Sequence, residues 1–403
     1  MIRKDSGNEP RKQIKNKTLN KIIAWVHLWP SLVSAVLLVF VCLTGTIIVY
    51  ADEIMELSAG KSRYVEQVGK EKLDPLVLMQ KVKERYPDRR NPGYIVSYKD
   101  PHRATRINSF DPKAGLRMIY MDPYTGEVLK NDPTIHFFYV TAHLHSQLLL
   151  HEPGFWIVAV ATIIFLIELI TGLILWWPAK WNKHNRDASF KIKWKAKFKR
   201  LNYDLHNVMG FYSLAICLIL TVTGLIIAFE PVQNLTLKIF GTNSEAHEWE
   251  HKLEDERLEN PATVNYAALE KQIFERHPYK KEIQLYSFNL SDSSSYYVMN
   301  VAKSIGLKSA EDAERIYVDR QTGEEIATPG FVNAHNKVEN AWWNLHMGKW
   351  MGPVGKLLTF VGGLIATSLP VTGFLIWWGR RKKKPSKSKT LSHKKADAVP
   401  QLN

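Results

Sequence analysis

The 403-residue chain has only two cysteines, Cys42 and Cys217. Both lie inside long apolar runs, so no disulfide framework can form in the polar segments of the chain. The Cys-x-x-Cys-His motif that attaches c-type haem covalently does not occur in the sequence either. We therefore expect the two cysteines to be packing residues within a membrane.

Acidic residues are scarce in three segments, residues 1–22, 178–203 and 379–403. Together these segments carry 25 of the 54 Lys and Arg residues but only four of the 39 Asp and Glu residues. The whole excess of positive charge, +15, therefore lies in segments that flank the apolar runs. This distribution is typical of the cytoplasmic loops of membrane proteins rather than of a nucleic-acid-binding surface.

Four apolar runs are long enough to cross a membrane, at residues 23–50, 155–177, 211–229 and 354–378. A hydrocarbon core of about 30 Å requires about 20 apolar residues in a helix. The first run is too long for a cleavable signal peptide and lacks a small-residue cleavage site. With the basic segments inside, the sequence predicts a multi-pass protein of the bacterial inner membrane, with both termini in the cytoplasm.

The predicted organisation alternates membrane helices with larger exported segments. Two small periplasmic α+β domains are expected, one in each exported loop, because a helical stretch precedes alternating strands in both. The first loop has a helix at 73–86 and strands at 94–98 and 116–120. The second has a helix at 266–276 and strands at 283–290, 296–301 and 315–318. Polar stretches at 245–259 and 289–295 are expected to be surface connections. The boundaries are 1–22 basic tail, 23–50 first helix, 51–142 first domain, 143–177 outer segment and second helix, 178–203 basic loop, 204–229 third helix, 230–341 second domain, 342–378 outer segment and fourth helix, and 379–403 basic tail.

The two halves of the chain repeat each other. The first and third helices superpose at an offset of 179 residues, which aligns His27 with His206 and Thr44-Gly45 with Thr223-Gly224. The second and fourth helices superpose at an offset of 201 residues, which aligns His145 with His346 and Thr171-Gly172 with Thr372-Gly373. The sequence therefore predicts a tandem repeat of helix, exported domain and helix.

Four of the fourteen histidines occupy repeated positions: His27, His206, His145 and His346. A histidine in or beside a membrane helix is costly unless it faces a partner or a ligand. Paired imidazoles from facing helices can hold haem iron from both sides. We therefore expect one haem near the cytoplasmic side, held by His27 and His206, and one near the outer side, held by His145 and His346. The simpler alternative is that these histidines lie at the membrane interface and form hydrogen bonds with lipid headgroups or with the backbone.

The second pair raises a geometric question. His145 precedes Trp177 by 32 residues, about 48 Å of continuous helix, which is more than the membrane core alone requires. The pair must lie at the outer surface, or the chain must bend near Pro153-Gly154 and Gly352-Pro353. A zinc or copper site also stays open there, because His136, His143, His151 or His335 could add ligands to the outer pair.

Other features are less specific. The Thr-Gly pairs permit the close approach either of another helix or of a planar cofactor. Glu168 is an acid within the second apolar run, and it has no counterpart in the second half. Trp342 and Trp343 could line a substrate cleft, but interface anchors are the preferred interpretation.

Together these motifs resemble those of the PepSY-associated transmembrane helix proteins, also called iron-regulated membrane proteins. The resemblance rests on the early histidine of the first helix, the Leu-His pairs before the second and fourth helices, the Thr-Gly endings with their paired tryptophans, and the Asp-x-x-Thr-Gly turns of the exported loops. The family includes siderophore reductases of the ferrioxamine-reductase type. The resemblance implies two b-type haems per chain and a ferric siderophore as substrate.

The expected function is thus transmembrane electron transfer, with a ferric siderophore reduced in the periplasm and ferrous iron released. No side chain acts as nucleophile or general base in this chemistry. Some relatives carry a fused flavin reductase, whereas this chain ends in a lysine-rich tail, so we expect the donor to be a separate cytoplasmic flavin reductase or a membrane quinol. The alternative is a non-catalytic membrane protein whose exported domains bind or restrain a partner such as a protease. A transporter is disfavoured, since no broken helix is evident.

Overall fold

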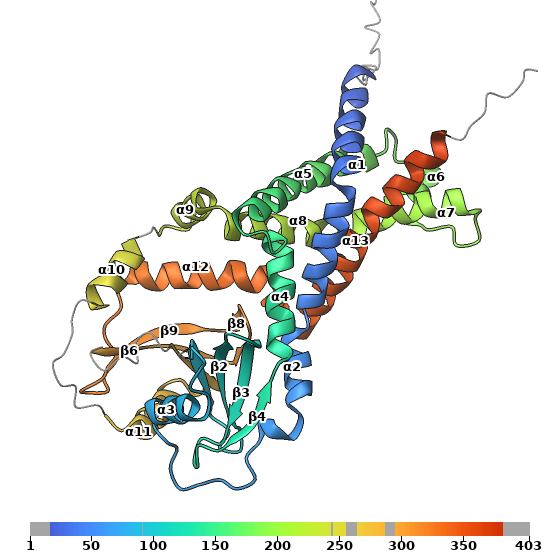
Figure 1. The fold of residues 1–403 in the computed structure, drawn as a ribbon. Coiled ribbons are helices and arrows are strands. Elements are labelled where there is room, and N and C mark those ends of the chain that lie inside the picture. Colours follow the sequence, from blue (N-terminus) through green and yellow to red (C-terminus); the bar gives the residue numbers. More distant parts are fainter. Residues whose placement is uncertain (1–16, 91, 243–244, 255–263, 287–294, 382–403) are drawn as a thin grey trace, which may run out of the picture.

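The computed structural model describes residues 17–90, 92–242, 245–254, 264–286 and 295–381. Within these ranges, helices gather at one end of the molecule and a β-sheet at the other (Figure 1). The two parts are joined by α2 (Ala51–Ala59), α4 (Thr134–Gln147) and α12 (Gly330–His346).

Four helices of the described chain are long and apolar enough to span a membrane, as predicted. They are α1 (Lys17–Ile48), α5 (Glu152–Trp176), a third span built from α7 (Phe198–Asp204), the π-helical turn η2 (Leu205–Met209) and α8 (Gly210–Ala228), and α13 (Gly352–Arg381). Helix α1 packs against α5 and α13, and α8 packs against the same two helices. Cys217 is buried in the core of this bundle, as expected for a packing residue.

The chain bends before the second and fourth membrane helices, which is one of the two alternatives that the sequence left open. Helix α4 ends at Gln147, and Leu148, Leu149 and His151 have positive φ angles of 54°, 58° and 57° before α5 begins at Glu152. A Cβ at Gly154 would lie only 1.8 Å from the Gln147 carbonyl oxygen, so the turn requires glycine at that position. Helix α12 likewise ends at His346, and a short 3₁₀ turn, η4 (Lys349–Met351), leads into α13.

The loop between the first two membrane helices and the loop between the last two contribute to one antiparallel sheet. Its seven strands run in the order β4-β3-β2-β1-β5-β6-β9. Their bounds are β1 (Tyr94–Tyr98), β2 (Thr105–Asp111), β3 (Gly115–Met121), β4 (Val128–Asp132), β5 (Glu282–Tyr286), β6 (Tyr296–Ala302) and β9 (Glu314–Asp319). The short strands β7 (Ser304–Ile305) and β8 (Ala310–Glu311) form a separate pair.

The expectation of two separate exported domains therefore needs correction. Strand β1 of the first loop pairs with β5 of the second along its whole length. Tyr94 lies opposite Tyr286 at one end, and Tyr98 lies opposite Glu282 at the other. Helices α3 (Pro75–Arg85) and α11 (Tyr266–Arg276) lie on the same face of the sheet and share one hydrophobic core (Figure 1). Pairing removes the exposed edges that β1 and β5 would otherwise present, and it buries one continuous apolar layer.

The predicted local elements agree with the structure in most places. Helices α3 and α11 and strands β1, β3, β6 and β9 lie where the patterns place them, and β5 begins one residue early. Residues 287–290 of the predicted strand 283–290 lie outside the described residues. The predicted connection at 245–259 was wrong in its first part, because α10 (Glu245–Glu254) is a helix; its remainder and residues 289–294 also lie outside the described chain.

Three further short helices complete the described chain: η1 (Gly60–Arg63), α6 (Lys183–Phe190) and α9 (Glu230–Ile239). Helices α4 and α12 pack against the face of the sheet opposite α3 and α11. Ile135 and Phe138 of α4 contact Met118 and Tyr120 of β3, and Val332 of α12 packs into the cluster around Tyr317. The sheet thereby becomes the platform that positions the ends of α4 and α12.

Continuity of the sheet can be tested by a cross-link between the two halves. In a variant without the native cysteines, Val96→Cys and Gln284→Cys face each other across β1 and β5, where Cα atoms lie about 4.5–5.5 Å apart, within reach of a disulfide. After oxidation and cleavage at a protease site placed in the 178–203 loop, the halves should stay joined until reduced. Val96→Cys with Asn300→Cys, about 10 Å apart across two strands, is the control and should not cross-link. Equal behaviour of the two variants would contradict a single sheet.

Candidate functional site

Two pairs of facing histidines lie within the helical part of the molecule. We call His27 and His206 the distal pair, because they lie far from the sheet. Their ring centroids are 6.5 Å apart, with an interplanar angle of 75°. His27 projects from α1 three residues before Pro30, and His206 lies on the π-helical turn η2. Such turns insert an extra residue into a helix and often re-aim a side chain at a functional site.

The second pair, His145 and His346, lies on the side of the sheet and is called the proximal pair. Its ring centroids are 6.2 Å apart, with an interplanar angle of 50°. His145 is in the last turn of α4, and His346 is the last residue of α12. The bends after these helices therefore turn the two imidazoles toward each other at the end of the bundle. The structure thus brings all four predicted residues into the two predicted pairs.

Each histidine contacts a Thr-Gly pair on a neighbouring membrane helix. The Nδ1 atom lies 3.0 Å from the threonine Oγ1 in three cases and 3.5 Å in the fourth. The four contacts are His27 with Thr171, His206 with Thr372, His346 with Thr223, and His145 with Thr44. Every contact joins two helices of the same half of the chain.

These contacts determine which ring nitrogen carries the proton. The Thr171 hydroxyl donates its own hydrogen to the Ile167 carbonyl at 2.7 Å, and the other three threonines also donate to carbonyls of their own helices. The threonine oxygen can therefore only accept from the histidine. His145 Nδ1 lies in addition 2.9 Å from the Val41 carbonyl oxygen, which is an acceptor alone. Each Nδ1 thus bears the hydrogen, and each Nε2 keeps a free lone pair for a ligand.

The glycine of each pair makes room for the imidazole. A Cβ at Gly172, Gly373 or Gly224 would lie 3.2–3.3 Å from Cε1 of the contacting histidine, and at Gly45 only 2.7 Å from Cε1 of His145. The sequence left open whether the Thr-Gly pairs admit a helix or a planar cofactor; in the structure they receive a histidine. The repeat offsets hold a signal for this role, since each Thr-Gly pair recurs together with a histidine.

The other candidate ligands do not join the pairs. His143 is half-buried and its Nδ1 lies 2.8 Å from the Tyr139 carbonyl of its own helix, while His136 Nδ1 accepts from Leu116 N–H at 3.2 Å. His151 is exposed, and His335 is buried within α12. Among the described residues, no three His, Cys, Asp or Glu side chains are grouped to hold a metal ion. Each pair thus consists of two histidines, whereas zinc sites use three or four protein ligands.

Glu168 lies on α5, and the two tryptophans Trp342 and Trp343 lie on α12. Glu168 is 8% exposed, and Ser34 Oγ donates to its carboxylate at 3.5 Å. It lies on α5 one turn before Thr171, and therefore close to the distal pair. Trp342 is buried and Trp343 half-buried on α12, where Lys308 lies 6.0 Å from the ring centroid of Trp343.

Comparison with family models identifies the chain. The model described as the PepSY-associated TM region matches residues 24–380, nearly the whole chain. The chain therefore belongs to this family of membrane proteins. A comparison with curated proteins finds no match.

The histidine–threonine contact can be tested by removing its acceptor. Thr171→Val keeps the shape of the side chain but leaves His27 Nδ1–H without the hydroxyl, which is expected to cost about 1 kcal/mol and to lower the apparent melting temperature in detergent by a few degrees. Thr162→Val is the matched control, because Thr162 lies on the same helix and donates only to the Val158 carbonyl. Equal melting temperatures for the two variants would show that the contact is not stabilising.

Proposed function

We propose that this member of the PepSY-associated family is a di-haem b electron-transfer protein of the bacterial inner membrane that reduces ferric siderophores on its outer side. One observation carries the proposal: two facing histidine pairs with free Nε2 atoms lie near opposite ends of one helical bundle. His27 precedes Gly45, which contacts His145, by 18 residues of α1. That separation is about 27 Å along the helix, close to the thickness of the hydrocarbon core.

The spacing within each pair fits the binding of one iron atom between two imidazoles. A bond of about 2.0 Å from metal to imidazole nitrogen, with roughly 1.2 Å from nitrogen to ring centroid on each side, places two coordinating rings about 6.4 Å apart. The observed separations are 6.5 Å and 6.2 Å. Bound haem would supply reversible one-electron chemistry, with its potential set by the axial ligands and by burial.

The residues of the chain prepare these sites before any cofactor binds. The threonine and the backbone carbonyl fix the tautomer and leave Nε2 as the nitrogen available to a ligand. The glycine lets the ring lie flush against the neighbouring helix. The four histidines are half-buried beside apolar membrane helices, which limit the access of water to the Nε2 lone pairs.

The proposed direction of electron flow follows from the charge distribution. The basic segments favour a cytoplasmic location for the end that holds the distal pair, so the sheet and the proximal pair face the periplasm. Oxidation of one membrane quinol, or of one reduced flavin in a cytoplasmic reductase, releases two electrons and two protons. Each electron converts one chelated ferric ion to ferrous iron, which binds hard oxygen ligands less tightly and is released.

The first test is a reduced-minus-oxidised optical spectrum of the purified protein with a haem-to-protein ratio. We expect b-type bands and two haems per chain, falling to one in His27→Ala or His206→Ala, because one axial ligand of the distal site is lost. His143→Ala is the control and should retain two, since His143 lies on α4 two residues before His145 but faces its own backbone. A protein without bands after expression with ample haem would refute the proposal and favour the binding or restraint of a periplasmic partner.

Reductase activity requires a separate measurement. Dithionite-reduced protein, freed of excess reductant, should be reoxidised on mixing with a ferric hydroxamate or ferric carboxylate chelate, with one ferrous ion appearing on a ferrous-specific chelator per electron lost. His145→Ala should slow this reoxidation at least tenfold, because the proximal pair is the exit site. Stable reduced bands in the presence of ferric chelates would show that the protein carries electrons to another acceptor.

A further inference from the structure

Helix α9 turns an apolar face away from the protein. Leu235 and Ile239 are 58% and 71% exposed, and they share one side of the helix because they lie four residues apart. Phe240, directly after the helix, is 65% exposed. Leu237 is buried, and at 3.6 residues per turn it lies on roughly the opposite side. The packed side and the outward side of this helix are therefore both apolar.

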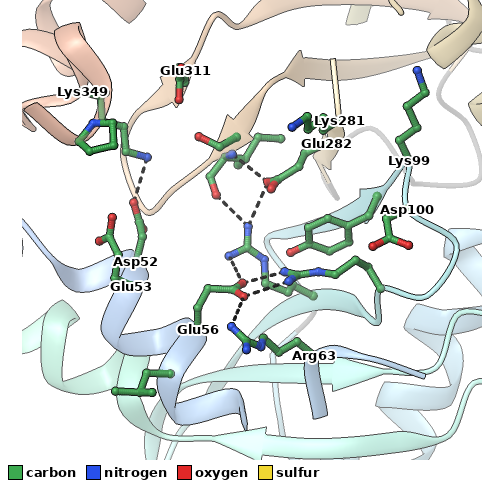
Figure 2. A pocket seen from close by; sticks show the side chains of 18 of the residues that line it. Asp52, Glu53, Glu56, Arg63, Lys99, Asp100, Lys281, Glu282, Glu311 and Lys349 are labelled. Atoms are coloured by element: carbon green, nitrogen blue, oxygen red, sulfur yellow. Dashed lines mark hydrogen bonds and ion pairs between the residues drawn. The ribbon is translucent and has the colours of Figure 1, made fainter. Parts of the chain in front are cut away.

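The internal repeat shows that this outward face is particular to the second half. At the offset of 179 residues, α9 corresponds to α2, and its three exposed apolar residues correspond to Glu56, Gly60 and Lys61. Glu56 lies 2.9 Å from Arg103 and 3.5 Å from Arg63, among charged side chains (Figure 2). The surroundings that suit α2 are thus water and charged groups, and the sequence of α9 is made for a different medium.

Helix α9 lies at the end of two membrane helices. Only Phe229 separates it from α8, and Gln233 Nε2 donates to the Ile227 carbonyl of α8 at 3.1 Å. The ring of Phe229 lies 6.0 Å from that of Trp156 on α5, which is 52% exposed. Tryptophan is enriched where membrane helices meet the headgroups. The apolar face of α9 therefore continues the lipid-facing surface of α5 and α8 at the end that holds the proximal pair.

The protein holds α9 in this orientation from both sides. Beyond the helix, Thr242 Oγ1 donates to the Phe331 carbonyl of α12 at 2.9 Å, and Thr242 itself is buried. Lys238 is exposed beside the apolar face, where its long stem can follow an apolar surface while the ammonium group reaches the headgroups. A helix face that met only water would be expected to be polar.

We propose that α9 lies in the membrane interface on the side of the sheet, with Leu235, Ile239 and Phe240 among the acyl chains of that leaflet. Helices of this kind bury their apolar face about 5–10 Å below the headgroups. Thr223, which contacts His346, precedes Phe229 by six residues, about 9 Å along α8. The proximal pair then lies inside this leaflet and not in the water above it.

The test measures what surrounds α9 in a bilayer. A nitroxide is attached to single cysteines in the full chain without its native cysteines, reconstituted in vesicles of phosphatidylethanolamine and phosphatidylglycerol. Oxygen concentrates in lipid and a nickel chelate stays in water, so the ratio of their collision rates reports the medium. At Leu235→Cys and Ile239→Cys we expect a ratio close to that at Val222→Cys, exposed on α8, and severalfold above that at Lys61→Cys, the exposed counterpart on α2.

Two outcomes would overturn the proposal. A ratio equal to that at Lys61→Cys would place α9 in water, and exclusion of both reagents would mean that protein, such as a second copy of the chain, covers the face. All four positions are exposed, so the variants should fold, which far-ultraviolet circular dichroism checks. The result does not depend on haem: a lipid-inserted α9 without haem refutes only the electron-transfer proposal, and two haems with α9 in water refute only this inference.

Discussion

The hydrogen bond from a histidine Nδ1–H to a threonine hydroxyl, made over a glycine, is the contact on which the arrangement of this protein depends. It occurs four times and always joins two helices of the same half. Without water in the bilayer, a polar ring must find its partners within the protein. The threonine and the carbonyl supply such partners, and they leave one nitrogen of each ring unused. The same contact therefore joins the helices and fixes the tautomer of each imidazole.

Three irregularities of the helices lie at the histidines that make this contact. The π-helical turn at Leu205–Met209 carries His206, and the bends after α4 and α12 hold His145 and His346 at the end of the bundle. Left-handed residues and the close approach at Gly154 make the first bend possible. Such conformations cost free energy, and they persist where the surrounding structure holds them in place.

The sheet also joins the two halves of the chain, outside the membrane helices. Pairing of β1 with β5 ties the two halves into one platform, against which α4 and α12 pack. The ion pairs of Asp52 and Glu53 with Lys349 and Lys356 then close the junction between this platform and α13. Charged side chains from the sheet and from the helices line this junction.

The sequence by itself determined the features that arise from local pattern. Runs of about 20 apolar residues can only be spanning helices, the charge of the flanking segments favours an orientation, and period-two alternation placed β1, β6 and β9. The repeat offsets singled out His27, His206, His145 and His346, because recurrence at a constant spacing needs no coordinates. Only the tertiary structure decided what links distant residues: the contacts between each histidine and a threonine 101 to 166 positions away, and the joining of two expected domains into one sheet. Hydrogen bonds, strand pairing and desolvation depend on which surfaces meet, and that information lies in the packing of the whole chain rather than in any window of it.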